Sequence, residues 1–210
     1  MKVNYQLEME RELARIAASG RRPRLLLHGC CAPCSAAVLE RLGELFDITM
    51  LYYNPNISPR EEYERRAEEA ERLIREMGVD ARLLVLPYDP APFREAARTL
   101  EDEPEGGRRC AACFRLRLQK TGELARDGGY DYFTTTLSIS PKKDAQLLNA
   151  IGGEVSRVVG VPYLYSDFKK KDGYRRSCVL SQTHGLYRQD YCGCAYSKAE
   201  REAQRRGAED

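Results

Sequence analysis

The chain has 210 residues, of which 42% are hydrophobic, and this is enough for one compact domain with a buried core. Its 34 lysines and arginines nearly balance its 32 aspartates and glutamates, so the net charge of +2 excludes a strongly basic nucleic-acid-binding or membrane-surface protein. The first 24 residues lack the apolar run of a signal peptide, and no later stretch approaches the roughly 20 apolar residues of a membrane span, so we expect a cytoplasmic protein without membrane contact.

An amphipathic helix is predicted at the start of the chain. Residues 5–19 place apolar side chains among charged ones at helical spacing, and Gly20 ends the pattern. We therefore divide the chain into an N-terminal helix, 1–22, and a single α/β catalytic domain, 23–210, that ends in a charged helix.

Short apolar runs then alternate with helical patterns. Predicted strands lie at 24–28, 47–54, 80–86, 130–137 and 162–165. Predicted helices lie at 33–42, 59–77, 108–126, 143–158 and 177–184, with a short helix and an exposed loop in 89–107 and a charged helix after 194. This alternation predicts a doubly wound α/β fold with a mostly parallel, five-stranded sheet. We expect a Rossmann-like domain, similar to the adenine-nucleotide alpha-hydrolases, with metal-binding insertions.

Seven of the eight cysteines fall into three closely spaced groups. The groups are Cys30, Cys31 and Cys34 after the first predicted strand, Cys110 and Cys113 in a C-x-x-C, and Cys192 and Cys194 in a C-x-C. Cys178 stands alone at a helical position that is typical of a small buried side chain. Because a reducing cytosol disfavours structural disulfides, so many grouped thiols predict metal binding or redox chemistry.

Thiolates suit zinc and iron–sulfur clusters, and seven thiols exceed what one tetrahedral site uses. Either one four-cysteine cluster leaves three thiols for other chemistry, or two metal sites lie side by side, and we favour two sites. Proteins with an open α/β sheet bind their substrates and cofactors at the carboxyl ends of the strands, where the first cysteine group lies. A zinc ribbon is the structural alternative, but ribbons use short hairpins, whereas this group follows a strand of the main sheet.

Five separated segments have unusual compositions. They are HGCCAPCS at 28–35, YYNPNI at 52–57, FTTTLSISPK at 133–142, FKKKDGY at 168–174 and LYRQDYCGC at 186–194. Together they resemble the cobalamin-independent epoxyqueuosine reductases, over about residues 25–197. The resemblance implies reduction of the epoxide of epoxyqueuosine, at the wobble position of certain tRNA anticodons, to the alkene of queuosine, with water as the other product.

The resemblance also implies a [4Fe–4S] cluster beside a second, mononuclear metal ion, which we expect to be iron. The expected ligands of the cluster are Cys30, Cys110, Cys113 and Cys194, and those of the second metal are Cys31, Cys34 and Cys192, with the two cysteines of the C-x-C interchangeable. Such a pair suits the reaction, because removal of an epoxide oxygen needs electrons, protons and stabilisation of the oxygen anion. The electrons would come from an external donor such as a ferredoxin or flavodoxin.

Polar residues near the strand ends and the C-x-C are further candidates for the catalytic site. They are His28, Asn54, Ser140, Lys142, Arg188 and Tyr191. His28 could orient a ligand thiolate or donate a proton. Arg188 and Tyr191 could hydrogen-bond or stack on the base and its cyclopentene substituent. Ordinary packing and capping are the alternative for each.

A local concentration of positive charge lies in 168–176 and includes two aromatic residues. The candidate RNA-binding residues are Lys169, Lys170, Lys171, Tyr174, Arg175 and Arg176. The basic side chains would contact phosphate, while an aromatic ring stacks on a splayed anticodon base. A solvated loop is the alternative, so the resemblance carries the expectation that the partner is tRNA with epoxyqueuosine.

Two other functions stay open from the residues alone. Adenylyl-sulfate reductases also combine a Cys-Cys pair with a distant C-x-x-C around a [4Fe–4S] cluster. Here, however, the turn after the first strand carries no Ser/Gly-rich loop that could hold a nucleotide phosphate. A zinc-stabilised RNA-binding module would use all seven grouped thiols structurally.

Overall fold

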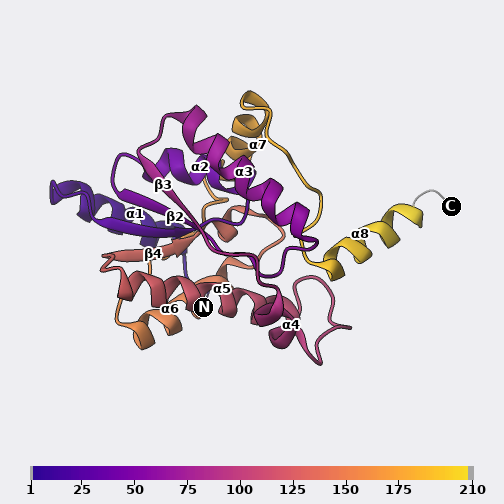
Figure 1. The fold of residues 1–210 in the computed structure, drawn as a ribbon. Coiled ribbons are helices and arrows are strands. Elements are labelled where there is room, and N and C mark those ends of the chain that lie inside the picture. The colour runs from indigo at the N-terminus through magenta and orange to yellow at the C-terminus, as the bar shows by residue number, and fades with distance from the viewer. Residues whose placement is uncertain (1, 208–210) are drawn as a thin grey trace.

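A four-stranded parallel sheet in the order β3-β2-β1-β4 forms the centre of the computed structural model, which describes residues 2–207 (Figure 1). The strands are β1 (Arg24–His28), β2 (Asp47–Tyr52), β3 (Ala81–Val85) and β4 (Tyr132–Thr135). The helices are α1 (Tyr5–Ala18), α2 (Ala32–Leu42), α3 (Arg60–Met77), α4 (Ala91–Ala97), α5 (Arg108–Asp127), α6 (Ala145–Val159), α7 (Gly173–Thr183) and α8 (Ala195–Arg206), with a 3-10 turn, η1 (Thr136–Ile139). The expected α/β fold with a parallel sheet is confirmed.

Strand β1 is buried on both faces, and this explains its uninterrupted apolar run. Successive side chains of a strand point to opposite faces. Leu25 and Leu27 accordingly pack with residues of α1, α2, α3 and α7, whereas Leu26 packs with residues of α5 and α6. The sheet therefore lies between two helical layers (Figure 1).

The N-terminal helix α1 belongs to one of these layers. Met9 and Ile16 of α1 are buried in the same core as Leu25 and Leu27 of β1. None of the helices within residues 2–207 combines the length and the apolar character needed to cross a membrane.

The segment 162–165 does not form the fifth strand that the sequence predicts. It makes a single parallel bridge, Phe133 to Tyr163, in which Phe133 donates to the Pro162 carbonyl (3.1 Å) and accepts from Leu164 (2.9 Å). The expected strand 130–137 is also shorter, because Thr135 caps η1 by accepting a hydrogen bond from the Leu137 amide. Strand β4 therefore ends at Thr135.

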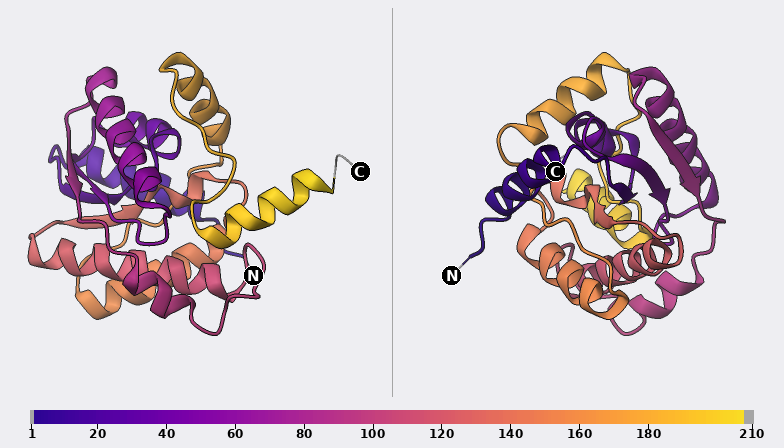
Figure 2. Two further views of the ribbon diagram at one scale, coloured as in Figure 1. Left: turned by 45° about the vertical axis from the view of Figure 1, so that its right-hand side comes forward. Right: turned by 90° about the vertical axis from the view of Figure 1, so that its left-hand side faces the viewer.

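The carboxyl ends of the strands face the part of the chain that links α7 to α8. This link, residues 184–194, passes from the layer of α7 toward α4 and α5, and α8 then projects from the body (Figures 1 and 2). Tyr196 of α8 packs edge-on against Phe93 of α4, with ring centroids 6.4 Å apart. The three cysteine groups are thereby brought to one end of the sheet.

Two adjacent glycines of α6 lie against the segment 162–165, and their substitution tests how closely the segment packs on α6. A Cβ at Gly152 would lie 2.4 Å from the buried ring of Tyr163, whereas a Cβ at Gly153 would meet mainly the terminal hydroxyl of the more exposed Tyr165. We expect Gly152→Ala to lower the free energy of unfolding by about 1–3 kcal/mol, measured by urea denaturation. Gly153→Ala is the matched control, which should change it little or raise it, because alanine favours the helix. Equal losses would contradict this packing.

Candidate metal centre and substrate cavity

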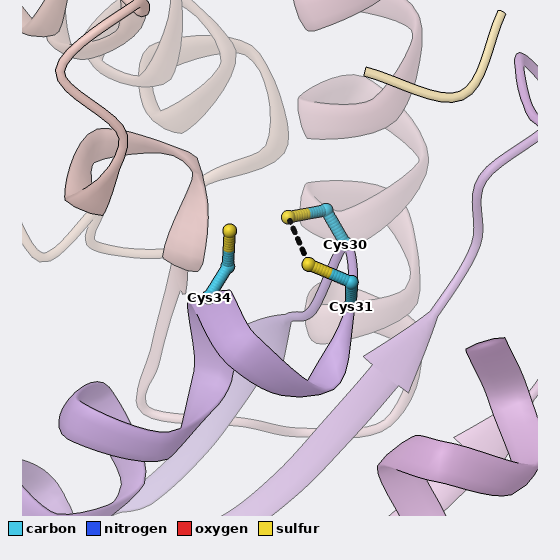
Figure 3. A group of neighbouring side chains, drawn as sticks. All are labelled: Cys30, Cys31 and Cys34. Atoms are coloured by element: carbon cyan, nitrogen blue, oxygen red, sulfur yellow. Dashed lines mark hydrogen bonds between the residues drawn. The ribbon is translucent and has the colours of Figure 1, made fainter. Parts of the chain in front are cut away.

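Three thiols gather at the turn between β1 and α2. The Sγ atoms of Cys30 and Cys31 are 3.9 Å apart, and those of Cys30, Cys31 and Cys34 lie within 4.8 Å of one another (Figure 3). Cys31 is the N-cap of α2, Pro33 lies in the first turn, and Cys34 follows on the same turn. The three sulfurs therefore form a ligand set that could hold one metal ion.

The other four grouped thiols surround a second cavity. Cys110 and Cys113 lie in the first turns of α5, Cys194 is the N-cap of α8, and Cys192 precedes it. All four line one cavity. The Cys110 sulfur accepts a hydrogen bond from the Gly106 amide (3.2 Å), and the Cys194 sulfur accepts one from the Ser197 amide (3.4 Å). Such N–H donors favour thiolates that ligate a metal.

Burial and mutual proximity control the protonation of these thiols. Burial raises the pKa of Cys113 to about 12, against the effect of Arg117, and the nearby thiolate of Cys192 adds to the rise. In the first group, hydrogen bonds from Cys31 and Cys34 hold the pKa of Cys30 well below its usual value. The same bond raises the pKa of Cys31 to about 12, because its thiol donates to Cys30. Each group therefore contains thiols that stay protonated at neutral pH unless a bound metal ion displaces the proton.

Three buried arginines lie beside the thiols, and the sequence analysis missed all of them. Arg66, Arg109 and Arg117 are at most 2% exposed. Arg66 donates to the Cys192 carbonyl at 3.1 Å, and Arg117 donates to that of Cys113 at 3.4 Å. Arg117 follows Cys113 by four residues, which places both on one face of α5, and this spacing could have revealed it.

Two of these arginines line the four-cysteine cavity and have a buried donor without a partner among the described residues. The Arg109 Nε and the Arg117 Nη2 are buried without a hydrogen-bond partner among the described residues, and both arginines line this cavity. A buried donor without an acceptor is costly. Four thiols together with unpaired cationic donors fit an anionic, sulfur-rich group such as an iron–sulfur cluster.

A larger cavity, of about 420 Å³, opens beside the first cysteine group. Its lining includes Cys30, Cys31, Cys34, Cys192, Ser140, Lys142, Lys143, Tyr174, Arg188, Gln189 and Tyr191. Its volume lies in the usual range of small-molecule sites. Cys192 lines this cavity and the four-cysteine cavity, so the two are neighbours. We call the larger one the substrate cavity.

The structure brings together four of the six non-cysteine residues that were expected at the catalytic site. Ser140, Lys142, Arg188 and Tyr191 line the substrate cavity. His28 and Asn54 lie beneath it and are fully buried.

Both ring nitrogens of His28 are engaged within the core. Nδ1 lies 2.9 Å from Thr135 Oγ1 and Nε2 lies 3.1 Å from the Tyr53 carbonyl, and burial lowers the pKa of His28 to about 4. The ring is therefore neutral at physiological pH and joins β1 to β4 and to the end of β2. Asn54 donates to the Gly29 carbonyl (3.0 Å) and thereby supports the turn that carries the first cysteine group.

Lys143 is a further residue of the substrate cavity that the sequence analysis did not single out. It is half-buried, unlike the exposed Lys142. Burial disfavours its charge, but Cys192, Cys30 and Cys34 outweigh that effect once they are ionised, and they raise the pKa of Lys143. A cation is thus held beside both groups of sulfur ligands.

Half of the expected RNA-binding residues form ion pairs within the protein. The pairs are Lys169 with Asp167 (2.7 Å), Lys171 with Glu10 (2.5 Å) and Arg176 with Glu40 (2.6 Å). Tyr174 lines the substrate cavity, and Lys170 and Arg175 are exposed. Because α7 begins at Gly173, the expected loop 168–176 is helical from there on. Lys171 and Arg176 hold the end of the loop and the first turn of α7 against α1 and α2, and Lys170 and Arg175 stay exposed.

Cys178 lies apart from both cysteine groups. It is half-buried on α7. Among the described residues that line the two cavities, Cys178 does not occur. This agrees with its exclusion from the expected ligands.

Comparison with known proteins shows one family throughout. The family model of the epoxyqueuosine reductase QueH matches residues 25–200. Among similar proteins, each named epoxyqueuosine reductase QueH, the one from Staphylococcus epidermidis is 41% identical, over 93% of this chain and 85% of the relative. That from Streptococcus pyogenes is 42% identical over 93% and 78%, and that from Thermotoga maritima is 34% identical over 84% and 91%. Because the matches span most of the chain, it belongs to the epoxyqueuosine reductase QueH family.

Proposed function

We propose that this protein reduces epoxyqueuosine in tRNA to queuosine at a metal centre held by its seven grouped cysteines. One observation carries the proposal beyond family membership: a three-thiol group opens on the substrate cavity, and a four-thiol cavity lies directly behind it. This order matches a path for electrons from a cluster to a bound nucleoside. Since the substrate is tRNA, we place the reaction in the cytoplasm.

The spatial grouping favours a particular division of the ligands. We assign the [4Fe–4S] cluster to Cys110, Cys113, Cys192 and Cys194, and the second metal, which we take to be iron, to Cys30, Cys31 and Cys34. The division expected from the sequence instead gives Cys30 to the cluster and Cys192 to the second metal. Cys192 lines both cavities, so it is the thiol through which the two centres are most directly connected.

A bound [4Fe–4S] cluster would supply single electrons, and a Lewis-acidic metal would polarise the epoxide oxygen. Conversion to the alkene takes up two electrons and two protons and releases water. Lys143 is placed to stabilise negative charge on the departing oxygen, because its cationic Nζ is held beside the first cysteine group. Arg188 and Tyr191, which line the same cavity, would orient the modified base.

The partner side of the proposal rests on cations that have no carboxylate partner among residues 2–207. Lys142 and Arg188 line the substrate cavity and are exposed, Lys170 lies in the loop before α7, and Arg175 lies in the first turn of α7. We assign these four to the phosphates of the anticodon arm. The electron donor, such as a ferredoxin or flavodoxin, would bind elsewhere and reduce the cluster.

A direct assay tests the activity. Anaerobically purified, reduced protein is incubated with tRNA that carries epoxyqueuosine, the RNA is digested, and the nucleosides are separated by mass. We expect queuosine to form and iron and sulfide to be present. Protein with intact iron and sulfide but without conversion would contradict the proposed reaction, and zinc in place of iron would favour a structural role of the thiols.

The variant Cys30→Ala decides between the two divisions of the ligands. If Cys30 binds the second metal, the variant keeps its acid-labile sulfide and loses only the iron of that site. Cys113→Ala should lose sulfide in either case, and Cys178→Ala is the control that should lose neither metal nor sulfide. Loss of sulfide from Cys30→Ala would show that Cys30 is a ligand of the cluster, as the sequence-based division has it.

The salt dependence of tRNA binding tests the partner surface. Each phosphate contact contributes roughly 0.7–0.9 to the slope of the logarithm of affinity against the logarithm of salt concentration. We expect Lys170→Gln and Arg175→Gln each to lower this slope by about that amount. Lys171→Gln, in the same loop but paired with Glu10, is the matched control and should change it little. Equal slopes for all three variants would contradict the assignment.

A further inference from the structure

Arg117 is a fixed cation between the two cysteine groups. It lies on α5, is 1% exposed, and donates from Nε to the Cys113 carbonyl at 3.4 Å and from Nη1 to Asn54 Oδ1 at 3.3 Å. Asn54 in turn donates to the Gly29 carbonyl, next to Cys30. One chain of hydrogen bonds therefore connects the helix of the C-x-x-C to the turn of the first cysteine group.

The charge of Arg117 is balanced differently from that of the other buried arginines. Arg66 pairs with Glu62 at 2.6 Å, and Arg109 pairs with Glu200 at 2.9 Å. For Arg117, no ion pair with a carboxylate occurs among residues 2–207, whereas Cys110 and Cys113 line the same cavity as Arg117. A buried cation without an anionic partner is strongly destabilising. The anion that offsets Arg117 must therefore come from the metal centre or its thiolates.

The remaining nitrogen of Arg117 is placed to meet such an anion. Nη2 is buried and has no hydrogen-bond partner among the described residues, and Arg117 lines the four-cysteine cavity. A guanidinium directs its donors in a rigid plane, so the bonds from Nε and Nη1 also determine where Nη2 points. Lysine could supply the charge but not these three directions at once.

We propose that Arg117 is a positioning residue that donates a hydrogen bond from Nη2 to sulfur in the four-cysteine cavity and stabilises the reduced form of the group bound there. The inference rests on the proposed function, which places a [4Fe–4S] cluster in this cavity. Reduction adds one negative charge to the cluster, so a nearby fixed cation favours the reduced form. Net charge and hydrogen bonds to sulfur both set the potentials of such clusters, and Arg117 would act through both.

The midpoint potential of the cluster tests this role, measured by redox titration without tRNA on protein with full iron and sulfide content. Arg117→Met removes the charge at similar length, and we expect a more negative potential. Arg117→Gln, which keeps an amide donor, has the same expectation and is used if the methionine variant does not fold. Arg117→Lys, which keeps the charge, should restore part of the potential. Arg115→Met removes an exposed charge from the same helix and should leave the potential unchanged.

A second measurement does not depend on activity. The rise in melting temperature on loading of iron and sulfide should be smaller in Arg117→Met than in the unaltered protein, because the cluster no longer offsets a buried cation. An unchanged potential and an unchanged rise would overturn the role of Arg117 while leaving the proposed function intact. Conversely, a protein that shows the expected shifts but forms no queuosine would refute the proposed reaction alone.

Discussion

Buried cysteines and buried arginines lie side by side at the carboxyl ends of the strands, and the burial of each depends on the charge of the other. A thiolate and a guanidinium are both costly to remove from water, and each becomes tolerable only beside an opposite charge. Arg66 and Arg109 pair with glutamates, whereas Arg117 lines the four-cysteine cavity without a carboxylate partner among residues 2–207, and its Nη2 has no hydrogen-bond partner there. The protein interior is therefore prepared for an anionic metal–thiolate group before any substrate binds.

The sheet determines where this charge balance can form. Because all four strands are parallel, their carboxyl ends lie at one edge, where the turn after β1 presents Cys30, Cys31 and Cys34. The start of α5 and the link before α8 bring the other four thiols to the same edge. His28 and Asn54 tie this turn to its neighbours from below, so they support the site without lining the substrate cavity.

Cations near the substrate cavity are divided between two tasks. Lys169, Lys171 and Arg176 bind carboxylates of the protein and hold the loop before α7 and the first turn of α7 in place. Others, such as Lys170 and Arg175, stay exposed on the same side of the molecule. The loop before α5 is acidic at residues 101–105 and would repel phosphate. This asymmetry supports the proposed contact of tRNA with the exposed cations.

The sequence by itself determined the α/β fold, nearly all helix and strand positions, the seven grouped cysteines and the family. The fold and the cysteine groups depend on local signals, namely apolar periodicity, turn residues and motif spacing, whereas the family rests on the resemblance of five short segments. Only the tertiary structure decided which thiols face one another, that the segment 162–165 makes a bridge instead of a strand, and that Arg117 is buried. The physical reason is that a charged residue on a helix is usually solvated, and its burial depends on contacts between segments far apart in the chain.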